Sequence, residues 1–242
     1  MADAAYGWVD AVLFERREGW DADAWPFNLP VLRNLDRLDL HPRCTFIVGE
    51  NGAGKSTLME AMAEALGFSA EGGSRDHRMN RDYTERLSRF LRPVRRTGLR
   101  PPDGWFLRAE SHYNIADYLD EVGSRPYGER PLRQQSHGES VFALLQHRFG
   151  GEGLYLMDEP EAGLSPSRQL SFLARMHDLI ADASQFLIAT HSPIILGYPD
   201  AVIYEASERG LNRIAFEDAE AVTASRGFLN HRETMLRTLL GD

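Results

Sequence analysis

This sequence contains only one cysteine and one lysine, and it has no net positive charge. The single cysteine, Cys44, cannot form a disulfide within the chain, which favours a reducing, cytoplasmic setting. The formal net charge of −9 argues against a protein coated by nucleic acid, because neutralising phosphates requires a basic surface. No apolar run reaches the roughly 18 residues of a membrane span, and the first residues lack the basic and apolar regions of a signal peptide. We therefore expect a soluble protein that does not insert into a membrane by itself.

Lysine is so scarce that only one of the 27 Lys and Arg residues is a lysine, Lys55. It lies in the segment 49–57, GENGAGKST, which fits G-x-x-x-x-G-K-[ST] at every fixed position. An apolar segment typical of a strand (44–48) precedes it, and a segment with helical spacing (56–66) follows. Backbone amides of such a loop, together with the helix dipole, bind phosphates. The sequence therefore predicts a nucleoside triphosphate site.

Within this loop, Lys55 is expected on the β- and γ-phosphates, and the Ser56 hydroxyl is expected to be a Mg²⁺ ligand. The loop residues expected to contact the nucleotide are Glu50, Asn51, Gly52, Ala53, Gly54, Lys55, Ser56 and Thr57.

Two further strand ends carry polar side chains suited to the same chemistry. The apolar segment 153–159 ends in Asp158 and Glu159. The first can hold Mg²⁺ through water, and the second can polarise an attacking water. The apolar segment 186–190 ends at His191, which could donate a hydrogen bond to the γ-phosphate or to that water. Taken alone, His191 could equally be a turn residue with a structural hydrogen bond.

Three other features leave alternatives open. Trp25 and Phe27 precede Lys55 by a distance at which an aromatic ring could stack on the base, although both could be core residues. The polar segment 136–140 precedes an amphipathic helix, so its small residues could bind an anion or merely cap that helix. The Arg-rich segment 89–100 could meet phosphates or an acidic partner, although a solvated face is favoured.

The remaining pattern alternates strands and helices, which indicates an α/β fold. Strands are expected at 7–17 and 105–109, with a pair at 201–205 and 213–217 around Gly210. Helices are expected from Asp82 to about residue 91, and at 112–122, 140–149, 166–181 and 219–240, with Ser165 and Asp218 as N-caps.

The order of these motifs resembles the ABC-type ATPase fold, most closely a group of small stand-alone bacterial ABC-type or AAA-family ATPases related to RecF and SMC heads. The resemblance implies one domain over residues 1–242: a mixed, mainly parallel sheet flanked by helices, with an N-terminal antiparallel region and a helical insertion at about 68–135. It implies ATP as the nucleotide, Glu159 as catalytic glutamate and His191 as switch histidine. Ser136 and Gly138 match the signature motif, which contacts the nucleotide of the other subunit in a head-to-tail dimer, and residues 162–165 fall at the D-loop.

The sequence also departs from that family. The signature reads QSHGE at 135–139, and no glutamine lies between Lys55 and Gln134, so the Q-loop residue that couples to a transporter's membrane subunit is missing. Glu110 or Ser111 is a candidate replacement. The interval from Lys55 to Ser136 has no sustained heptads, which excludes a coiled-coil arm.

We therefore expect an ATPase that closes as a dimer on Mg-ATP and acts as a switch on a partner protein or on DNA, as in repair or phage defence. The alternatives are the nucleotide-binding subunit of a membrane transporter and a nucleotide sensor that does not hydrolyse.

Overall fold

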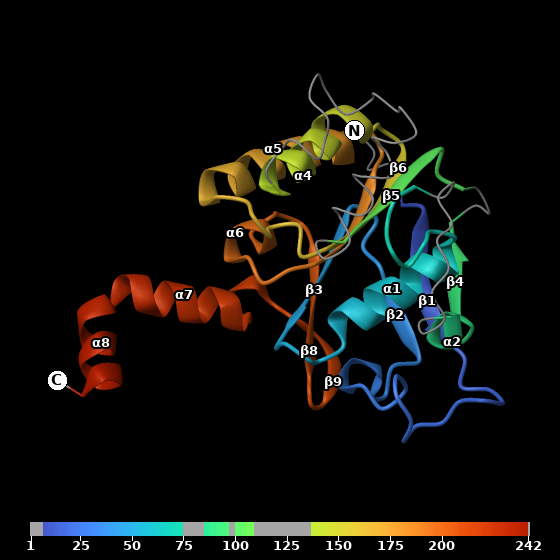
Figure 1. The fold of residues 1–242 in the computed structure, drawn as a ribbon, viewed down its shortest axis with the longest axis horizontal. Coiled ribbons are helices and arrows are strands. Elements are labelled where there is room, and N and C mark those ends of the chain that lie inside the picture. Colours follow the sequence, from blue (N-terminus) through green and yellow to red (C-terminus); the bar gives the residue numbers. More distant parts are fainter. Residues whose placement is uncertain (1–6, 75–84, 97–99, 109–136, 242) are drawn as a thin grey trace.

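A six-stranded sheet forms the centre of the molecule (Figure 1). The structure is a computed structural model that describes residues 7–74, 85–96, 100–108 and 137–241. The strand order is β5-β6-β7-β3-β8-β9, and every pair is parallel except β8 with β9. The strands are β3 (Cys44–Gly49), β5 (Asp103–Arg108), β6 (Gly153–Asp158), β7 (Gln185–Ala189), β8 (Val202–Ser207) and β9 (Gly210–Ile214). The mainly parallel α/β sheet is confirmed.

A second, antiparallel sheet of three strands confirms the expected N-terminal β region. Its order is β2-β1-β4, formed by β1 (Val9–Phe14), β2 (Arg37–Asp39) and β4 (Leu91–Arg95). The expected helix up to residue 91 is wrong at its end, because helix α2 covers only Glu85–Ser88 and β4 begins at Leu91. Pro93 is tolerated there since β4 lies at the edge of its sheet and pairs only with β1.

Helices cover both faces of the central sheet, and each face has its own apolar core. Helix α1 (Lys55–Leu66) follows β3 and ends at Gly67 in the left-handed region, as expected. Helix α5 (Pro166–Ala181) begins at its predicted cap, where the Ser165 hydroxyl accepts from the Arg168 amide. Helix α4 (His137–Ala143) continues into a π-helical turn, Leu144–Arg148, and α6 spans Pro193–Leu196.

The C-terminal segment forms two helices, α7 (Glu220–Asn230) and α8 (Arg232–Leu240). Asp218 is not the N-cap of α7, contrary to the prediction: it ends a short 3₁₀ helix, Phe216–Asp218, and Ala219 takes the cap position. In Figure 1 both helices extend away from the body of the molecule.

The Arg-rich segment is paired within the fold. Arg92 forms an ion pair with Glu15 (2.6 Å), and Arg96 forms one with Asp10 (2.7 Å). The side chains of Arg92 and Arg96 remain partly exposed in these pairs, which favours the solvated-face alternative for this segment. The expected helix at 112–122 lies outside the described residues, while β4 and β5 show that part of the 68–135 segment is strand. Among the described residues, no helix is long and apolar enough to cross a bilayer.

Gln185 joins the two sheets through its side-chain amide. Its Oε1 accepts from the amides of Trp8 (2.8 Å) and Val9 (2.9 Å), and its Nε2 donates to the carbonyls of Val9 (2.8 Å) and His41 (3.0 Å). All four hydrogen-bonding positions of a buried amide are thus used. The first residue of β7 therefore fixes the start of β1 and the turn before β3.

A second polar cluster anchors the π-helical turn to the sheet. Asp103 at the start of β5 lies 2.8 Å from Arg148 Nη1, and its Oδ2 lies 2.7 Å from the Tyr155 hydroxyl. Arg148 also stacks over the ring of Trp105. Burial raises the pKa of the Asp103 carboxyl, but hydrogen bonds from Tyr155 and Arg148 outweigh burial and hold its pKa below the ordinary value.

Replacing Asp103 is expected to make the stability of the fold less dependent on pH in the acid range. A carboxyl whose pKa is depressed by folding stabilises the fold fully above its unfolded pKa of about 3.9 and loses that contribution as pH falls through the folded value. Asp103→Asn should therefore melt at lower temperature than the parent at pH 7, with the difference shrinking below about pH 4. Melting curves from pH 3 to 7 measure this, and a difference that stays constant across that range contradicts it.

Candidate functional site

The loop between β3 and α1 has a backbone that only glycine fits at its key positions. Gly49, Gly52 and Gly54 have φ values of 132°, 83° and 95°. A Cβ on Gly49 would lie 2.2 Å from the carbonyl oxygen of Ala206, and one on Gly54 would lie 2.9 Å from Val31. The loop is therefore pressed between β8 and the short 3₁₀ helix Pro30–Leu32.

Lys55 is held inside this loop. Its Nζ donates to the carbonyls of Gly49 (2.7 Å) and Glu50 (2.9 Å), and the side chain is buried. Burial lowers the pKa of the ammonium, while the nearby carboxylates of Glu159 and Asp158 raise it. The structure thus brings Lys55 close to the two carboxylates that the sequence placed at the end of β6.

Those carboxylates lie at the carboxyl end of the sheet beside β7. Asp158 is buried at the last position of β6, next to Ala189. Glu159 has a left-handed backbone (φ 53°), which is strained for a residue with a side chain, and its amide donates to Ala189 (2.9 Å). The Ser56 hydroxyl and the Asp158 carboxylate are hard oxygen donors, which suit Mg²⁺. When bound, that ion would supply positive charge beside the phosphates.

His191 meets Glu159 at this edge of the sheet. Its Nε2 lies 3.8 Å from Glu159 Oε1, and both side chains are partly exposed. The His191 amide donates to Glu161 Oε1 (2.6 Å), and the next residue, Ser192, caps α6. The His191 side chain therefore faces the Glu159 carboxylate at this edge of the sheet.

Glu161 is a site residue that sequence reasoning missed. Nothing in its spacing along the sequence shows that its carboxylate binds the backbone of a residue 30 positions later. Its carboxylate also contributes to the electrostatic environment of Lys55.

Removing the Glu161 carboxylate is expected to reduce kcat about tenfold with little change in KM for ATP, because it orients His191 rather than the bound nucleotide. Glu161→Ala tests this in a steady-state assay. Glu161→Gln keeps the accepting oxygen and should retain most of the activity; equal losses in both variants would contradict the positioning role.

The signature and D-loop regions touch one another. A Cβ on Gly138, in the first turn of α4, would lie 2.2 Å from the carbonyl oxygen of Gly163. Gly138 therefore has to be a glycine for α4 to approach the 162–165 segment this closely. Ser136, Glu110 and Ser111 lie outside the described residues, so their expected roles remain predictions.

The aromatic residues before the loop do not lie where base stacking requires. Phe27 is buried between Trp20 (4.7 Å between ring centroids) and Phe90 (5.2 Å). The core alternative therefore applies to Phe27, and its expected contact with the base is corrected. Trp25 is 53% exposed, but it is not among the residues that line the cavities beside the loop.

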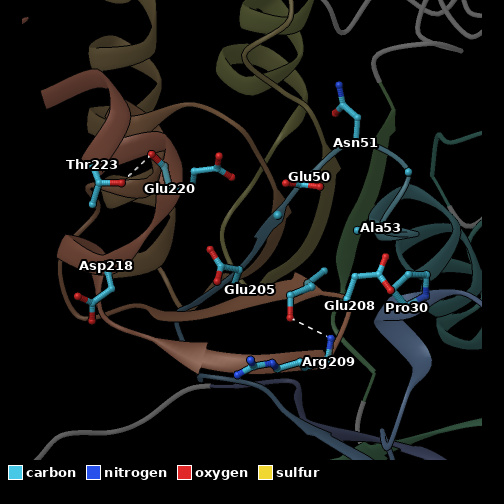
Figure 2. Close-up of a pocket in the computed structure, with 14 residues that line it drawn as sticks. Pro30, Glu50, Asn51, Ala53, Glu205, Glu208, Arg209, Asp218, Glu220 and Thr223 are labelled. Atoms are coloured by element: carbon cyan, nitrogen blue, oxygen red, sulfur yellow. Dashed lines mark hydrogen bonds between the residues drawn. The ribbon is translucent and has the colours of Figure 1, made fainter. Parts of the chain in front are cut away.

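Cavities formed by the described residues border the P-loop, and we consider two of them. The larger, of about 760 Å³, lies between the loop, the turn from β8 to β9 and the start of α7 (Figure 2). Its lining is strongly acidic: the carboxylates are those of Glu50, Glu205, Glu208, Asp218 and Glu220. Arg209 also lines this cavity. The smaller cavity, of about 420 Å³, contains Glu159 and His191 and is closed by Glu220, Ala221 and Ala224 of α7. Glu159, His191 and the P-loop thus line one cavity, and α7 forms part of its wall.

Comparison with known proteins identifies the family of this chain. The family described as "AAA domain" matches residues 27–94, and the family described as "AAA domain, putative AbiEii toxin, Type IV TA system" matches residues 67–197, more than half of the chain. The cobalt import ATP-binding protein CbiO of Salmonella typhimurium is 26% identical over 196 residues, which cover 72% of each chain. The hemin import ATP-binding protein HmuV of Rhodopseudomonas palustris is 31% identical over 174 residues, or 62% of this chain and 65% of that protein.

A solved structure has the same fold over nearly the whole chain. The cbiO1 protein of Clostridium perfringens, part of the ABC transporter complex cbiONQ, superimposes with a TM-score of 0.50 at 15% identity, covering 94% of this chain and 97% of that one. The fold, the P-loop and the paired carboxylates therefore agree with the family match. The chain belongs to the AAA-domain family that matches residues 67–197, and it is an ABC-type ATPase with ATP and Mg²⁺ as its cofactors.

Proposed function

We propose that this ATPase closes as a head-to-tail dimer on two Mg-ATP molecules and uses hydrolysis as a timer that reopens the dimer. The observation that carries the proposal is the 3.8 Å approach of His191 to Glu159 in the cavity beside the P-loop. Two nucleotides bound between subunits favour the closed state, and their hydrolysis removes that preference.

In the proposed reaction, water attacks the γ-phosphate in line with the leaving oxygen. Glu159 polarises the water and accepts its proton, while Lys55, the loop amides and His191 stabilise the developing charge. Ser56 and Asp158 would hold Mg²⁺. Ser136 and Gly138 would reach the nucleotide of the partner subunit.

The dimer is proposed to act in the cytoplasm as a switch on a partner protein or on DNA. The single, buried Cys44 suits a reducing compartment. Phosphate release by the purified chain with Mg-ATP, with and without DNA, measured alongside its mass in solution, tests this. DNA-stimulated turnover by a dimer supports action on DNA, whereas turnover indifferent to DNA supports a protein partner. A chain that remains monomeric at saturating ATP contradicts the proposal.

The similarity to CbiO and HmuV favours a second candidate, the ATP-binding subunit of an importer. The missing Q-loop glutamine weighs against it, because that residue couples the family's ATPases to membrane subunits. Stable recovery of the chain with membrane proteins, with turnover only in their presence, would favour this candidate. The Glu159–His191 pair argues against the third candidate, a nucleotide sensor that does not hydrolyse ATP. Dimerisation that depends on ATP but occurs without ATP turnover would favour that candidate.

A further inference from the structure

The C-terminal arm, defined as α7 and α8 (residues 220–240), exposes large apolar side chains. Leu229 is 76% exposed, and Leu239 and Leu240 are each 70% exposed. Phe228 adds a fourth exposed apolar side chain. Val222 is the buried residue of α7, and none of the nine residues of α8 is buried. Four of the six exposed large hydrophobic residues in the described part of the chain thus lie on this arm.

Helices this short are not stable by themselves. Isolated helices of fewer than about 12 residues are marginal in water, and most helices in proteins are stabilised by packing an apolar face. In α8 the side chains of Met235, Leu236, Leu239 and Leu240 recur at helical spacing and form such a face. An apolar face that extends from the body, as in Figure 1, requires a covering surface.

The arm starts at the catalytic cavity. Ala221 and Ala224 line the cavity that contains Glu159 and His191, and Phe228 follows one turn later on the same face of α7. This face of α7 therefore extends from the cavity that contains Glu159 and His191 to the exposed Phe228. A subunit that closes over the catalytic cavity must also meet the arm.

The charge of the arm is opposite to that of the rest of the chain. The arm carries Arg226, Arg232 and Arg237 against the two carboxylates of Glu220 and Glu233, whereas the whole chain has a net charge of −9. A second copy of the chain, with its net charge of −9, therefore attracts the arginines of the arm, which favours this occupant electrostatically.

We propose that the arm docks on a second copy of this chain and forms part of the ATP-dependent dimer interface. The inference rests on the proposed function, because closure over the nucleotide brings the second copy to the arm. Docking buries Leu239 and Leu240 and gives α8 the packing that it lacks in one subunit.

The test compares two double variants in the Glu159→Gln background, in which ATP is bound but not hydrolysed. Leu239→Glu/Leu240→Glu places two charges on the apolar face of α8. Thr234→Glu/Thr238→Glu places the same two charges on its exposed polar face. The dimer dissociation constant with ATP is measured by light scattering, and circular dichroism and fluorescent-ATP binding confirm that each variant is folded.

We expect the leucine variant to weaken the dimer at least about tenfold and the threonine variant to leave it unchanged. Equal dimerisation of the two variants overturns the role of the arm and leaves the proposed function standing. A Glu159→Gln chain that stays monomeric at saturating ATP overturns both.

A second measurement does not depend on a destabilising change. Cys44 is fully buried, so a fluorophore attached to Leu239→Cys labels the arm selectively. ATP should shift its emission to the blue in the Glu159→Gln background, with a midpoint that follows protein concentration. An emission spectrum that ATP leaves unchanged while the mass doubles overturns the inference.

Discussion

Glu159→Gln is expected to reduce steady-state ATP hydrolysis by about 10²- to 10⁴-fold and to hold the chain as an ATP-bound dimer. Glutamine has the shape of glutamate but accepts no proton from the attacking water. The Lys55 ammonium and the loop amides remain in place, so ATP still binds. Phosphate release and mass in solution at saturating Mg-ATP measure both effects.

The matched control is Glu18→Gln, which removes the same charge from an exposed position before the P-loop. It should hydrolyse and dimerise like the parent. If Glu159→Gln retains more than about a tenth of the parent activity, another group activates the water and the assigned role of Glu159 is wrong.

The largest loss of stability is expected from Gln185→Leu. Leucine fills a similar volume but leaves the amides of Trp8 and Val9 and the carbonyls of Val9 and His41 without their buried partner. Each unsatisfied group costs on the order of 1–3 kcal/mol, so a total near 4 kcal/mol is a conservative expectation. At this chain length that corresponds to a fall in Tm on the order of 10 °C.

Gln146→Leu is the comparison for this prediction, because Gln146 is exposed in the π-helical turn. Thermal unfolding of the two variants should differ by most of the expected shift. Similar melting temperatures would mean that water replaces Gln185 at the junction of the two sheets.

The sequence was sufficient for most of the central sheet and for the position of the P-loop, because both depend on local patterns. The strand expected at 213–217 is wrong in its bounds, since β9 covers Gly210–Ile214. A glycine-rich turn after an apolar strand has few alternative structures, and parallel strands bring their carboxyl ends to one edge. The carboxylates of Asp158 and Glu159 therefore lie within electrostatic reach of Lys55, and Glu159 Oε1 lies 3.8 Å from His191 Nε2.

What the sequence could not predict depends on contacts between distant residues. Gln185 binds residues 176 and 177 positions earlier, and no local property of a glutamine shows this. Phe27 lies at the sequence distance before Lys55 that suits base stacking, but its ring packs against the rings of Trp20 and Phe90. Leu91–Arg95 became a strand because β1 offered it a partner, which overrides the helical character of the preceding residues.

The contact between Gly138 and Gly163 has a consequence for communication between subunits. Gly138 belongs to the motif proposed to reach the neighbour's nucleotide, whereas Gly163 follows the chain's own Glu159 by four residues. No side chain lies between them to absorb a displacement. In a dimer of the proposed kind, occupancy of one nucleotide site would thereby be transmitted to Glu159 at the other, and we expect turnover to rise with ATP concentration more steeply than a simple hyperbola.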